Sequence, residues 1–195
     1  MSQFADGTFA KGLFASVPKI VTVPAESGFA GAMTFQSILR SPPYDIQVED
    51  GDDGGRMVTV AIARSDDGDR VVSVVCEMVD TPLFDAVYSE FSFGIAVFSL
   101  SEQSEAFVTQ ERQTALPYIP DDIRSEVMNV VCEGLKFLVK DLNPVQVYWV
   151  TKDRDPHEKA LPKYNMLMET LENMGFSASQ EGTDRFSRRF WTMNR

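Results

Sequence analysis

A helix-length stripe of apolar residues, set between two strand-like runs, constrains the fold of this chain more than any other feature. The stretch "EFSFGIAVFSL" before the stripe and "VQVYWVT" after it are both typical of β-strands. A helix that links two strands of one sheet implies a crossover connection, so we expect the sheet to be parallel at this place. The stripe repeats at the helical period over Ile123, Val127, Val130, Val131, Leu135, Leu138 and Leu142, and we expect its helix to start at Pro120.

The flanking segments predict antiparallel strands on one side and a second helix on the other. "YDIQVE", "RMVTVAIAR" and "RVVSVVCEMV" are β-branched runs, and Asp67-Gly68 supplies the left-handed turn of a hairpin. A second helix is expected from about Leu161 to Met174, ended by Gly175 and followed by the strands "FSASQ" and "RFSRRFWTM". The sequence therefore predicts an α/β (α+β) domain, whose mixed, mostly antiparallel, twisted sheet is flanked by helices.

The N-terminal quarter carries weaker patterns. "FAGAMTFQSIL", residues 29–39, favours a helix that "SPPY" ends, because a residue before proline is pushed out of the helical region. The acidic stretch "EDGDDGG" is interpreted as a hairpin turn, because its spacing lacks the ligands of a calcium loop. We expect residues 1–50 to form a segment packed on a single domain of residues 51–195.

Composition excludes several classes of function. The 195 residues carry a net charge of −11, which disfavours a general nucleic-acid surface and favours a role in solubility or a basic partner. No apolar run approaches the roughly 20 residues of a membrane span, and the first residues do not read as a signal peptide. Cys76 and Cys132 lie in apolar runs with no C-x-x-C spacing, so no metal site is expected. A cytoplasmic location is the expectation.

The order of elements in the C-terminal third resembles the GNAT superfamily of acyl-CoA N-acyltransferases. The resemblance spans residues 58–195 and rests on "VQVYWVT", on "ALPKYNMLMETLENMGF" with its helix-ending Gly-Phe, and on the last strand "GTDRFSRRFWTM". It implies a GNAT-like fold, acetyl-CoA or another acyl-CoA as the acyl donor, and a small amine as the acceptor. An enzyme of this kind would be an acyl-CoA-dependent N-acyltransferase.

The chain departs from that family where the donor's phosphates are held. The family's glycine-rich loop corresponds to "SLSEQSEAFVTQERQTALPYIPDDIR", which contains no glycine and ends in two carboxylates. Such a loop binds pyrophosphate through backbone amides at a helix N-terminus, and carboxylates there repel phosphate. The family's tyrosine acid corresponds to Leu171, and its asparagine to Tyr164. The pattern is that of a diverged member without the glycine-rich pyrophosphate loop.

Three residues are candidates for catalysis. His157 is the single histidine and has Asp155 and Glu158 nearby, so it is a candidate acid or base; a solvated loop histidine is the simpler interpretation. Asp122 is a candidate proton acceptor from an amine, with helix capping as the simpler reason for its position. Tyr164 is a candidate through its position in the GNAT-like helix.

Three arginines near the C-terminus are candidates for cofactor binding. Arg185, Arg188 and Arg189 surround an aromatic strand in an otherwise acidic chain. Guanidinium groups suit the recognition of phosphate or carboxylate. Pairing with the protein's own carboxylates and stacking on neighbouring rings is the alternative, and both stay open.

Three functions follow from these patterns. The first is a diverged GNAT-like protein that serves as a non-catalytic binding or assembly module through protein–protein interaction. The second is an N-acyltransferase that moves an acyl group from acyl-CoA to an amine. The third is an acidic inhibitor or immunity-type protein whose charge matches a basic target. Whether the chain is an enzyme is left open at this point.

Overall fold

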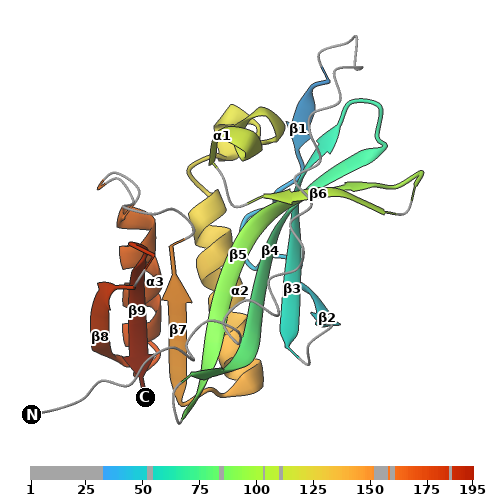
Figure 1. Cartoon of the computed structure of the whole chain (residues 1–195). Helices are drawn as coiled ribbons and strands as arrows, with labels where there is room; N and C mark the ends of the chain where they lie inside the picture. The colour runs from blue at the N-terminus through green and yellow to red at the C-terminus, as the bar shows by residue number, and fades with distance from the viewer. Residues whose placement is uncertain are drawn as a thin grey trace, which may run out of the picture.

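A computed structural model describes residues 33–51, 55–83, 86–102, 104–109, 112–151, 158, 161–184 and 186–195 (Figure 1). Within these residues the chain forms one nine-stranded sheet and two longer helices. The strands are β1 (Phe35–Ser37), β2 (Gln47–Asp50), β3 (Arg56–Ser65), β4 (Arg70–Leu83), β5 (Ala86–Ser99), β6 (Ser104–Thr109), β7 (Gln146–Val150), β8 (Ser177–Thr183) and β9 (Arg189–Asn194). The helical elements are α1 (Arg112–Ala115), η1 (Leu116–Tyr118), η2 (Asp121–Ile123), α2 (Val127–Leu142) and α3 (Pro162–Glu172).

The sheet is antiparallel except at one seam. Its order is β1-β3-β4-β5-β7-β9-β8, with β2 also paired to β3 and β6 also paired to β5. At the seam β5 and β7 run parallel, with Ser89 opposite Val147 and Glu90 opposite Tyr148. Beyond these pairs the two strands diverge (Figure 1). The mixed, mostly antiparallel α/β fold is therefore confirmed, and the parallel pair lies where the helical crossover predicted it.

Strand β6 was not predicted. The segment Ser104–Thr109 pairs with the C-terminal part of β5, from Ile95 to Ser99. Because β4 occupies the other edge of β5 along its whole length, β6 lies on the same edge as β7. Strand β7 therefore pairs with this edge near the start of β5, and β6 pairs with it near the end of β5.

Both longer helices cover the same face of the sheet. Helix α2 packs on β3 and β4, and α3 packs on α2 and β8. A Cβ atom at Gly134 would lie 2.9 Å from Cys76 Sγ, so glycine is what lets α2 approach β4 so closely. Further along this face the rings of Tyr164 and Trp191 stack with centroids 5.0 Å apart, and Trp149 stacks on Trp191 at 6.1 Å. The face opposite α2 and α3 is called the far face below.

Several local predictions are confirmed. Gly68 has φ of +75° in the β3–β4 hairpin turn, and Gly175 has φ of +90° just past α3. The backbone N–H of Phe176 donates to Leu171 O at 3.0 Å, and the Phe176 ring is buried beneath the helix end. Helix α2 ends at Leu142, as its stripe predicted.

Two predictions about helices are wrong. Residues 33–39 do not continue a helix, because Phe35–Ser37 completes the edge of β3 as strand β1; residues 29–32 lie outside the described part of the chain. Helix α2 begins at Val127 and not at Pro120. Between them Asp121–Ile123 form the short helical turn η2, and Asp121 pairs with Arg124, just after it, at 2.6 Å instead of capping the long helix. In the first case strand pairing with β3, and in the second the ion pair with Arg124, outweighs the helical pattern of the local sequence.

Candidate functional site

An acidic and a phenolic residue lie opposite each other on the far face at the parallel seam. Glu90 of β5 and Tyr148 of β7 are registered opposite each other, on the strand positions that alternate with the helix-facing Phe91 and Val147. Tyr148 is buried and Glu90 partly buried. The hydroxyl of Thr81, from β4, donates to Glu90 Oε2 at 3.3 Å. The carboxyl group of Glu90 therefore lies on β5 between two neighbouring strands, with a hydrogen-bond donor on β4 and Tyr148 on β7.

Burial sets the proton affinity of both groups. Removal from water raises the pKa of Glu90, against the lowering effects of the Thr81 hydrogen bond and the charge of Arg188. Burial also raises the pKa of Tyr148 to about 12, with the charge of Glu90 adding to the effect. Tyr148 therefore keeps its proton at neutral pH. Glu90 binds a proton more readily than an exposed glutamate does, which suits a proton acceptor.

Two aromatic rings contact the Tyr148 ring. The Tyr88 and Tyr148 rings meet edge to face with centroids 6.5 Å apart, and those of Tyr148 and Phe190 lie 6.3 Å apart. The row runs across β5, β7 and β9. Rings of this kind supply apolar contact and a negative face that attracts ammonium groups. The seam site, defined here as Tyr88, Glu90, Tyr148 and Phe190, is chemically suited to an amine.

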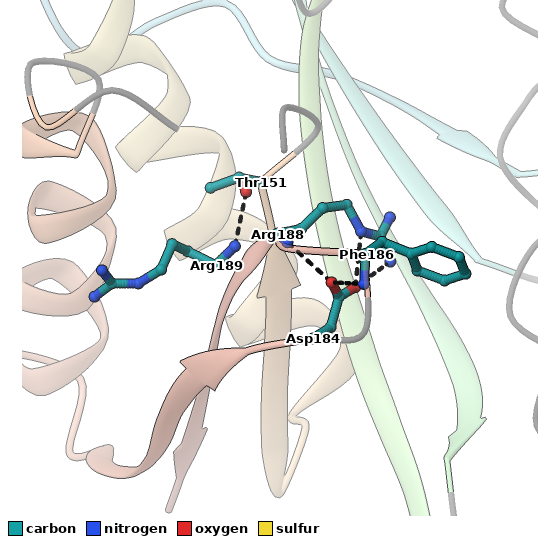
Figure 2. Close-up of polar contacts among 5 residues, drawn as sticks. All are labelled: Thr151, Asp184, Phe186, Arg188 and Arg189. Atoms are coloured by element: carbon teal, nitrogen blue, oxygen red, sulfur yellow. Dashed lines mark hydrogen bonds and ion pairs between the residues drawn. The ribbon is translucent and has the colours of Figure 1, made fainter. Parts of the chain in front are cut away.

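The two described arginine candidates are paired within the chain (Figure 2). Arg188 Nε donates to Asp184 Oδ2 at 2.8 Å, and the Asp184 carboxylate also accepts the backbone N–H groups of Arg188 and Phe186, each at 2.9 Å. The Arg188 guanidinium lies 5.4 Å from the Phe186 ring centroid. This arrangement matches the alternative of internal pairing and ring stacking.

Arg189 points to the other side of the strand in Figure 2. Its backbone N–H donates to Thr151 Oγ1 at 3.0 Å, and its guanidinium pairs with Glu181 and lies 5.9 Å from the Trp191 ring centroid. The side chain is about one-third exposed, so it stays accessible to solvent. A role of Arg188 or Arg189 in cofactor binding remains a prediction.

The other candidates are dispersed or lie outside the described residues. Tyr164 is buried on the helix-covered face, stacked on Trp191 with Lys163 Nζ 4.8 Å from its ring centroid. Glu90 is on the opposite face, so the sheet separates the two. Asp122 is exposed in η2. His157 and Arg185 lie outside the described part of the chain.

The seam site was missed by the sequence patterns. Glu90 stands alone as a carboxylate in the apolar stretch "YSEFSFG", and a charge inside a central strand was a usable signal. Its partner Tyr148 belongs to a strand far along the chain. Their meeting depends on the register of β5 and β7, which local patterns do not contain.

Three further observations concern anions, metal ions and membranes. The first turn of α2 contains no acidic residue, because Asp121 and Asp122 precede it in η2. Among the residues that the structure describes, no three His, Cys, Asp or Glu side chains are grouped to hold a metal ion. None of the described helices is both long and apolar enough to cross a membrane.

Comparison with known proteins gives weak likenesses only. No family model matches the chain, and no curated protein matches it. Three solved structures of the spermidine N-acetyltransferase SpeG from Vibrio cholerae, two of them chimeras with hSSAT and one a point mutant, are 12% identical. They match 73% of this chain and 65–67% of their own, with TM-scores of 0.34–0.35.

Loss of the Asp184 carboxylate should destabilise the β8–β9 connection. Burial alone would raise its pKa, but the backbone and side-chain hydrogen bonds from Arg188 and the backbone N–H of Phe186 lower it overall. We expect Asp184→Ala to cost about 1.5–3 kcal/mol of unfolding free energy at pH 7, measured by urea denaturation. Because the folded-state pKa is lowered, this contribution is present above pH ~4 and is lost as the pH falls through the folded value.

The matched control for this variant is Asp121→Ala, which removes an exposed pair with Arg124. It should change the unfolding free energy by less than about 1 kcal/mol. Equal costs for the two variants, or a cost for Asp184→Ala that stays constant down to pH 3, would contradict the assigned role.

Proposed function

We propose that the chain transfers an acyl group from acyl-CoA to an amine at the seam site. The observation that carries the proposal is Glu90, a partly buried carboxyl group with a raised pKa, placed where β5 and β7 diverge. The aromatic row around it supports an amine as acceptor. The resemblance of residues 58–195 to the GNAT superfamily supports the acyl donor.

The chemistry assigns one role to each polar group. Glu90 takes a proton from the ammonium form of the substrate, and the free amine nitrogen attacks the thioester carbonyl carbon. The C–N bond forms, the C–S bond breaks, and the sulfur leaves as the thiolate of coenzyme A. The nitrogen then loses its second proton, which ends on that thiolate. Tyr148, protonated at neutral pH, donates a hydrogen bond to the developing negative charge.

Binding of the donor is the first test. Acetyl-CoA at about 100 times its dissociation constant should raise the unfolding free energy by about 2.7 kcal/mol, which corresponds to roughly 5–10 °C in Tm for a chain of this size. Differential scanning fluorimetry measures the shift. Release of free thiol from acetyl-CoA, in the presence of a small amine, measures turnover.

Two controls sharpen this measurement. The thiol assay needs a blank without acetyl-CoA, because Cys76 and Cys132 are free thiols, although both are buried. If the Arg189 guanidinium binds a phosphate of acetyl-CoA, Arg189→Ala should remove most of the Tm shift. An unchanged Tm shift would exclude Arg189 from donor binding. The absence of any shift at millimolar acetyl-CoA would overturn the proposal as a whole.

A second candidate is a non-catalytic binding or assembly module of the same architecture. It is favoured by β6, which occupies the edge of β5 from Ile95 to Ser99, and by the internal pairing of Arg188 and Arg189. The glycine-free segment before α2 supports it too. A net charge of −11 then suits a basic protein partner. This candidate predicts neither stabilisation by acetyl-CoA nor thiol release.

A further inference from the structure

An apolar groove crosses the far face away from the seam site. It has a volume of about 570 Å³ and spans β2, β3, β4 and β5, with Gln47, Glu49 and Arg64 among its polar lining residues. The far-face groove is defined by its apolar lining residues Ile38, Met57, Ala61, Val71, Phe98 and Leu100.

The same strands are covered very differently on their two faces. Beneath α2, Val58 and Cys76 are each 1% exposed. On the far face Met57, Val71 and Phe98 are only partly buried, while Ile38 and Leu100 are 42% and 49% exposed. Strands with apolar residues on both faces are typical of sheets that are covered on both sides. The far face therefore exposes apolar side chains that neither α2 nor α3 covers, because both helices lie on the other side.

The described part of the chain begins close to this groove. The described residues start at Met33, and Asp66 N–H, in the β3–β4 turn, donates to Thr34 O at 3.1 Å. Ile38, five residues further on, already lines the groove. The preceding 32 residues are long enough, because four strands about 4.8 Å apart span only about 15 Å.

The composition of residues 1–32 suits this position. Phe9, Leu13 and Val17 are among its large apolar residues, which are the kind of side chain that an apolar groove accepts. Two lysines, at positions 11 and 19, balance the acidic residues at 6 and 26, so the segment is neutral in a chain of net charge −11. A neutral apolar segment is not repelled by the acidic domain that it would cover.

We propose that residues 1–32 pack in the far-face groove and form the second covering layer of the sheet. The segment is part of the same chain, so docking pays no entropy of association between molecules. It would cover the β2–β5 half of the far face, whereas the seam site lies at β5, β7 and β9. The proposal stands independently of acyl transfer.

A double-mutant cycle on the full chain tests the proposal. One partner is the triple variant F9A/L13A/V17A, and the other is V71A/F98A in the groove. Each should lower Tm by about 4 °C or more, and the combined variant should fall clearly short of the sum, because the second change removes contacts already lost. The control partner is Val145→Ala, a 71% exposed site whose effect should add to that of the triple variant. Additive effects with the groove variant would overturn the proposal.

Photo-crosslinking tests the same proposal if one of these variants fails to fold. Benzoylphenylalanine introduced at Phe98 should form photo-crosslinks to residues 1–32 within one chain, and the same probe at the 62% exposed Val87 should not. Crosslinks between two copies, together with a dimer in light scattering, would assign the groove to a second molecule. Crosslinks confined to residues 33–195 would also refute the proposal.

Discussion

Replacing Glu90 by glutamine is expected to lower the rate of acyl transfer by about 10²–10⁴-fold. Glutamine keeps the size of the side chain and its contact with Thr81, but it cannot accept a proton from an ammonium group. The Tm shift with acetyl-CoA should survive, because the donor binds through other groups. Steady-state kinetics on the variant and the parent chain measures the loss. A variant with full activity would remove Glu90 from the mechanism.

The pH dependence separates this role from a structural one. Since only ionised Glu90 accepts a proton, the rate should rise with pH through the raised pKa of this group. Its effect on stability has the opposite sign: a raised folded-state pKa contributes stability below the unfolded value of about 4.3, and this is lost as pH rises through the folded value. Glu90→Gln should therefore gain stability relative to the parent chain between acidic and neutral pH. Glu172→Gln, an exposed position on α3, should change neither profile.

Replacing Trp191 by alanine is expected to reduce the unfolding free energy by about 3–5 kcal/mol. The side chain is 3% exposed and lies in ring contact with both Trp149 of β7 and Tyr164 of α3. Its removal loses apolar contact and two aromatic pairs, each worth about 0.5–1.5 kcal/mol beyond area burial. Urea denaturation followed by far-ultraviolet circular dichroism is the suitable measurement, since the variant lacks one fluorophore.

Two matched substitutions show whether this stack is the source of the effect. Trp191→Phe retains a ring between the same neighbours and should recover a large part of the loss. Val145→Ala, at a 71% exposed site, should stay within about 0.5 kcal/mol of the parent chain. If Trp191→Ala costs less than about 1 kcal/mol, the aromatic stack does not hold α3 to the sheet.

Local patterns were enough to predict the elements that are specified locally. Strands β3 and β4 follow from β-branched runs on either side of Gly68, whose positive φ closes their turn. Helix α2 follows from its apolar stripe, and the end of α3 follows from Gly175 and Phe176. Each of these signals lies within a few residues of the structure that it specifies.

Elements that depend on distant partners were missed. Strand β1 exists because Phe35–Ser37 pairs with β3, and β6 because Ser104–Thr109 pairs with β5. The role assigned to Glu90 arises in the same way, from the register that brings Tyr148 across the seam. The sequence showed that Arg188 and Arg189 were unusual, but not that Asp184 and Glu181 lie within reach of them.

The brevity of the β5–β7 seam has a mechanical consequence. Two registered residue pairs supply few backbone hydrogen bonds, so the ladder itself adds little cohesion across this line. The remaining cohesion across this line comes from side chains, through the packing of α2 on α3 and the contact between the Tyr88 and Tyr148 rings. A perturbation that separates those side chains would therefore release β7, β8, β9 and α3 together as one unit. An ordinary edge strand, by contrast, unpairs from its sheet alone.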